Sequence, residues 1–147
     1  MRDNLPATQG DVSALPDHRI LALEGPDAAR FAHAQFMSDV TALADGYWHW
    51  SGWLTPKGRV VALFALLRFD AQALWLLLPD ADPQELRDAL QRFVFRSKVT
   101  LTVRHDRHAA GTFAHPSRAS GALLANDACI ELDVGTSLAP RTLRMDA

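Results

Sequence analysis

Two polar residues, Gln35 and Asp39, stand four positions apart in the segment FAHAQFMSDV. A helix is predicted to open at residues 25–27 and to run to about Met37, which places Gln35 on the same stripe as Phe31. Asp39 then faces the negative end of the helix dipole, at a cost of about 0.3–1 kcal/mol. Both side chains could point into a pocket and hydrogen-bond a ligand. The alternative is that they bind local backbone and cap the helix end.

Two pairs of cations are further candidates for ligand binding. Lys57 and Arg59 flank the glycine of a predicted turn at residues 55–58. Arginine offers a bidentate fork and lysine a point charge, and both suit the binding of carboxylate groups. The alternative is that these are solvated charges on an ordinary hairpin. Arg96 and Lys98 are expected to close a second helix, where the dipole alone favours cations.

Trp53 lies in an aromatic segment, GYWHWSGWL, at residues 46–54. Its alternation predicts a strand with Tyr47, His49, Ser51 and Trp53 on one side and Trp48, Trp50 and Leu54 on the other. Aromatic faces could sandwich a flat ring, although an aromatic strand is most often part of a core.

The chain lacks the motifs of several common catalytic sites: G-x-S-x-G, G-x-G-x-x-G after a strand, a P-loop and H-E-x-x-H. His105, His108 and His115 lie in a segment without helical character, and no carboxylate or thiolate completes a zinc set with them. Cys129 is the only cysteine, and we interpret it as a small buried hydrophobe. We therefore name no catalytic residue and no metal ligand.

The composition is that of a globular protein. The 147 residues are 48% hydrophobic and 22% charged, with a net charge of -2, which gives no strong signal for nucleic-acid binding. The longest apolar stretch, residues 60–67, is far short of the ~20 residues that cross a bilayer, and the N-terminus lacks the apolar core of a signal peptide. We expect no membrane association and a cytoplasmic location.

The order of predicted elements is β-α-β-β-β-α-β, which indicates the α+β class with helices on an antiparallel sheet. The strands are expected at residues 20–23, 46–54, 59–69, 73–78 and 98–104, and the helices at 26–37 and 82–94. Asp82 followed by proline and Glu85 is a strong start signal for the second helix. We expect a flexible lead-in at 1–17, a domain at 18–105 and the start of a second, truncated subdomain at 106–147.

Four segments together resemble one protein family. They are G-P-D-A after the first strand, Q-F-M-S-D-V in the first helix, K-G-R in the hairpin and R-S-K-V after the second helix. In this order, over residues 19–104, they resemble the N-terminal domain of YgfZ-type proteins, which are relatives of the glycine-cleavage T-protein GcvT.

The resemblance implies a folate-binding-type domain of βαβββα units with tetrahydrofolate near its centre. The implied ligand-binding residues are Gln35, Asp39, Trp53, Lys57, Arg59, Arg96 and Lys98, with the Lys57 and Arg59 cations suited to the glutamate carboxylates of folate. YgfZ-type proteins are linked to iron-sulfur enzyme maintenance and tRNA modification, so iron-sulfur assembly proteins are implied partners. GcvT is an aminomethyltransferase.

The YgfZ signature K-G-C-Y-x-G-Q-E is absent, and Cys129 has none of its flanking residues. In the family this signature follows beyond the point where the chain ends, so we expect a truncated gene product that is a non-catalytic folate-binding module. Two alternatives stay open. One is a GcvT-like enzyme with Asp39 as an acid-base group, and the other is a protein-interaction domain that dimerises through an exposed apolar face.

Overall fold

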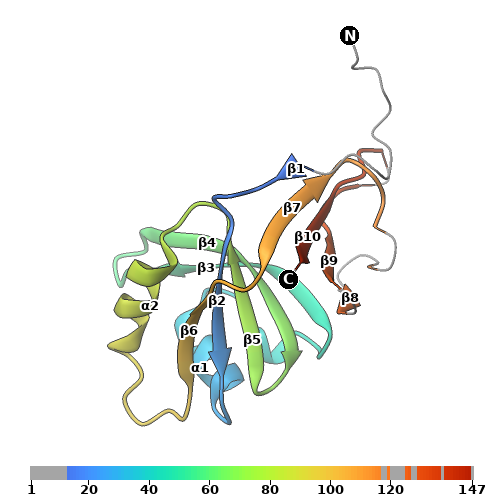
Figure 1. Cartoon of the computed structure of the whole chain (residues 1–147). Coiled ribbons are helices and arrows are strands. Elements are labelled where there is room, and N and C mark those ends of the chain that lie inside the picture. Colours follow the sequence, from blue (N-terminus) through green and yellow to red (C-terminus); the bar gives the residue numbers. More distant parts are fainter. Residues whose placement is uncertain (1–12, 117–118, 120–124, 127–128, 137, 147) are drawn as a thin grey trace. The chain divides into compact units, whose positions relative to one another are not determined.

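The computed structural model describes residues 13–116, 119, 125–126, 129–136 and 138–146 (Figure 1). The chain divides into two compact units. One comprises Asp17–His105, and the other combines Met1–Pro16 with Asp106–Ala147. Within the described residues, each unit contains an antiparallel sheet of five strands.

The sheet of unit 17–105 has the strand order β3-β4-β5-β2-β6. Its strands are β2 (Arg19–Glu24), β3 (Tyr47–Leu54), β4 (Val60–Asp70), β5 (Ala73–Leu78) and β6 (Thr100–Arg104). Two α-helices, α1 (Ala28–Gln35) and α2 (Pro83–Gln91), and a short 3-10 helix, η2 (Val40–Ala42), complete the unit. The predicted α+β class is confirmed.

The two helices pack on one face of this sheet. Alternate residues of the strands point to this face and form a core with the apolar stripes of the helices. The fully buried residues of this core include Leu21, Leu23, Phe64, Leu66, Leu74, Leu76 and Leu90. Strand β4 lies between β3 and β5, as its apolar character on both faces predicts. Strand β3 is left at the edge.

Helix α2 begins as the sequence predicts. The Asp82 carboxylate accepts hydrogen bonds from the N–H groups of Gln84 at 2.9 Å and Glu85 at 3.4 Å. The helix ends at Gln91, however, and the backbone hydrogen bonds that follow it join residues three positions apart, as in a 3-10 helix. The prediction that Arg96 and Lys98 close this helix is therefore wrong.

Helix α1 is shorter than predicted. It ends at Gln35, and Phe36 adopts an extended conformation with ψ of 161°. Phe36 then pairs with Trp53 of β3, and its ring meets Phe64 edge-on at 4.8 Å. Phe36 is buried in the core in an extended conformation. Because an extended residue cannot continue the helical hydrogen bonding, the helix ends here.

The second unit has the strand order β1-β7-β10-β9-β8 (Figure 1). Its strands are β1 (Ser13–Ala14), β7 (His108–Thr112), β8 (Ala125–Asn126), β9 (Ile130–Asp133) and β10 (Thr142–Asp146). Residues 13–14 were expected in a flexible lead-in, but they pair with β7. Across the described residues, no helix has the length and apolar character needed to span a membrane.

Candidate functional site

A group of polar side chains lies between the segment that follows α1 and the edge strand β3. The Ser38 hydroxyl is 2.8 Å from Nε2 of His49 and 2.7 Å from the hydroxyl of Ser51. Ser38 and His49 are half-buried and Ser51 is buried. With the neighbouring His33 and Asp39, these residues form what we call the β3 polar cluster.

Asp39 does not lie on α1 but caps η2. Its Oδ1 accepts hydrogen bonds from the N–H of Thr41 at 3.0 Å, the hydroxyl of Thr41 at 2.5 Å and the N–H of Ala42 at 3.2 Å. The prediction that a continuous helix to about Met37 places Asp39 at its C-terminal end, one turn after Gln35, is therefore wrong. The hydrogen bond from the Thr41 hydroxyl is the largest cause that holds the pKa of Asp39 below its usual value, so its exposed side chain is ionised at neutral pH.

His33 lies beside Asp39. Its Nδ1 accepts the N–H of Val40 at 3.2 Å and stands 3.5 Å from Oδ1 of Asp39.

His49 is held neutral at neutral pH. Burial lowers the pKa of its imidazole below the usual 6.5, and the negative charge of Asp39 opposes this effect in part. The neutral ring presents a lone pair at one nitrogen, which can accept the proton of the Ser38 hydroxyl.

The stability of this unit is expected to fall as the pH drops through 6.5 towards the lowered pKa of His49. In this range the unfolded chain binds a proton that the folded chain does not, so acid favours unfolding. His49→Gln should reduce the decline, measured by urea unfolding between pH 8 and pH 5. Burial also lowers the pKa of His18, so His18→Gln should likewise reduce the decline in stability. An undiminished decline in both variants would contradict the assignment.

The structure brings Gln35 and Trp53 into the same neighbourhood. Gln35 is half-buried and precedes Phe36, which pairs with Trp53. Trp53 is 8% exposed, and its ring meets Phe93 edge-on at 5.7 Å. Trp53 is therefore a member of the core at the border of the β3 polar cluster.

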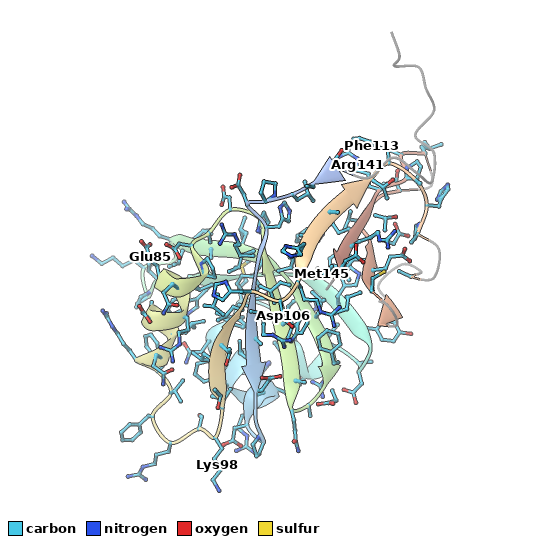
Figure 2. All side chains as sticks on the ribbon, viewed as in Figure 1. Glu85, Lys98, Asp106, Phe113, Arg141 and Met145 are labelled. Atoms are coloured by element: carbon cyan, nitrogen blue, oxygen red, sulfur yellow. The ribbon has the colours of Figure 1, made fainter. Side chains whose placement is uncertain are left out.

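The predicted cations do not come together. Lys57 and Arg59 are exposed at the turn between β3 and β4, whereas Lys98 precedes β6 at the other end of the sheet. The eleven residues of β4 separate these ends by roughly 30 Å. Figure 2 shows Lys98 at an extremity of the unit, far from Glu85 on α2. Arg96 stacks on the Phe95 ring at 5.2 Å.

A cavity of about 350 Å³ opens between α2 and β4. It is lined by Val61, Ala62, Ala81, Asp82, Glu85, Leu86 and Ala89. None of the predicted ligand-binding residues lines this cavity. The β3 polar cluster is therefore the place where predicted site residues meet further polar groups, and its exposed carboxylate suits a ligand rich in N–H donors.

Sequence reasoning missed Ser38, and it noted His49 and Ser51 only as residues of one strand face. The signal was nevertheless present. His49 and Ser51 share their side of β3 with Trp53, and this side faces the helices. Polar groups on a buried face need partners, so a hydroxyl from a neighbouring segment was to be expected.

Comparisons with known proteins agree with this architecture. No family model matches the chain. An uncharacterised protein of Haemophilus influenzae is 30% identical over 92 residues, which are 62% of this chain and 32% of that protein. The crystal structure of the glycine cleavage system aminomethyltransferase T from Bartonella henselae superposes with a TM-score of 0.79. The chain has the fold of the part of this aminomethyltransferase that it covers.

The superposition covers 92% of the chain and 41% of the aminomethyltransferase, at 13% sequence identity. This likeness establishes the fold alone. The chain spans about a third of the H. influenzae relative and about two fifths of the aminomethyltransferase.

Proposed function

We propose that this chain is a folate-binding module of the YgfZ and GcvT type, with the β3 polar cluster forming part of the site for a reduced folate. The module would serve a YgfZ-like protein in iron-sulfur enzyme maintenance and tRNA modification. The aminomethyltransferase fold and the ordered segments at 25–28, 35–40, 57–59 and 96–99 support this proposal.

One observation carries the assignment of the site. Each hydrogen bond that Asp39 accepts from a described residue goes to Oδ1, and Oδ2 receives none. An ionised carboxylate oxygen without a partner is a strong acceptor for the N–H groups of a pterin ring. The exposed Lys57 and Arg59 have no ion pair with a described residue, and their charges suit the glutamate carboxylates of folate.

The test is calorimetric titration with folinic acid, a stable reduced folate, using the parent chain and Asp39→Asn. Asparagine keeps an oxygen for capping η2 but replaces a carboxylate oxygen with an N–H donor. We expect binding to weaken about 10- to 100-fold, as for a lost hydrogen bond to a charged group. Asp88→Asn is the matched control, since the Asp88 side chain on α2 is 61% exposed and that of Asp39 is 62% exposed.

No heat from the parent chain at high micromolar folinic acid would exclude folate binding by the module. Equal weakening in both variants would show that Asp39 has no special part in it.

The alternative is a GcvT-like enzyme that transfers a one-carbon unit from an aminomethyl donor to tetrahydrofolate. The same carboxylate favours it, because Asp39 is ionised and exposed and could accept a proton. A transfer rate in the parent chain that disappears in Asp39→Asn would favour the enzyme. Binding of folinic acid without any transfer rate would favour the module.

A further inference from the structure

The segment 36–39 carries Asp39 and is held against the edge strand β3. One anchor is a backbone hydrogen bond from the N–H of Met37 to the carbonyl of Gly52, at 2.9 Å. The side chain of Ser38 supplies another through its contacts with His49 and Ser51. Ser38 immediately precedes Asp39, so whatever fixes Ser38 restricts the direction of the carboxylate.

The hydrogen bonds in this chain of side chains have a preferred direction. Ser51 is 5% exposed, and among the described residues its hydroxyl meets only Ser38. If Ser51 donates to Ser38, then Ser38 donates to Nε2 of His49, and each hydroxyl proton has an acceptor. In the reverse direction the proton of the buried Ser51 hydroxyl would lack an acceptor among these groups, which is costly.

We propose that Ser38, His49 and Ser51 are positioning residues that lock segment 36–39 onto β3 and keep Oδ2 of Asp39 turned towards the ligand. This inference rests on the proposed function, because the ligand is the reduced folate assigned above. The lock orders the segment before binding, so the ligand does not bear the entropy cost of ordering it.

The test uses Ser38→Ala, which removes the shared hydroxyl, and Ser38→Thr, which retains it. Ser97→Ala is the matched control, because Ser97 is also half-buried and lies in a loop of the same unit. The first readout is amide hydrogen exchange across residues 36–42, which needs no ligand. The second is the dissociation constant for folinic acid.

We expect Ser38→Ala to accelerate amide hydrogen exchange at residues 36–42 by about 2- to 10-fold, as for one lost hydrogen bond. The dissociation constant for folinic acid should rise by a similar factor. Ser38→Thr should restore both values, and Ser97→Ala should change neither. Threonine restores volume as well as the hydroxyl, so Ser38→Val, which has the shape of threonine without its hydroxyl, separates the two and should behave like Ser38→Ala.

Unchanged exchange in Ser38→Ala would overturn the lock. Faster exchange with an unchanged dissociation constant would overturn the positioning role while leaving folate binding intact. If the parent chain does not bind folinic acid, the proposed function and the positioning role both fail, and the exchange data then describe a purely structural lock.

Discussion

Replacing Gly25 with alanine is expected to lower the free energy of unfolding of unit 17–105 by about 3 kcal/mol or more. Gly25 has a φ of +137°, which disfavours any side chain, and an added methyl group would overlap the carbonyl oxygen of Lys98. The Lys98 backbone cannot easily move away, because Asp27 forms two hydrogen bonds with it. The N–H of Lys98 donates to the Asp27 carboxylate at 2.8 Å, and its carbonyl accepts the Asp27 N–H at 3.1 Å.

Urea unfolding followed by tryptophan fluorescence measures this effect. All four tryptophans, Trp48, Trp50, Trp53 and Trp75, belong to unit 17–105, so the signal reports on it directly. Gly58→Ala is the control, since Gly58 also has a positive φ, of +84°, but no atom lies within 4 Å of the added methyl group. The free energy of unfolding of Gly58→Ala should fall by only about 1–2 kcal/mol. Equal losses would contradict the steric argument.

Phe64→Ala is expected to destabilise the same unit by about 3–5 kcal/mol. Phe64 is fully buried, and its ring supports Phe36 at the point where α1 gives way to the segment that carries the β3 polar cluster. The substitution leaves a cavity under this segment, so it should also loosen the hold of β3 on residues 36–39.

The same fluorescence measurement serves for Phe64→Ala. Phe95→Ala is its control, because Phe95 is 82% exposed and its removal should change the free energy of unfolding by no more than about 0.5 kcal/mol. If both variants unfold at the same urea concentration, Phe64 does not carry the support for Phe36 that the packing indicates.

Much of the fold of unit 17–105 could be predicted from the sequence because its signals are local. Asp82 and the proline after it mark the start of α2 within four residues, and a cap needs no distant partner. The alternation in β3 and the apolar character of β4 define strands for the same reason, since the period of two is a property of the chain itself.

The candidate site could be predicted only in part. Asp39 was identified from its motif, but its role as a cap on η2 depends on where α1 ends, and this end is decided by the packing of Phe36 on Phe64. Lys57 and Lys98 were grouped as ligand-binding cations by charge and resemblance. The antiparallel register places them at opposite ends of the sheet.

The sequence by itself determined the α+β class and the order of helices and strands in unit 17–105. Only the tertiary structure decided that Ser38, His49 and Ser51 meet, because eleven and thirteen residues separate the partners of these hydrogen bonds. Such contacts follow from the docking of segment 36–39 on the edge of β3. Neither the period nor the propensity of either segment specifies that docking, since it depends on how the core between them fills.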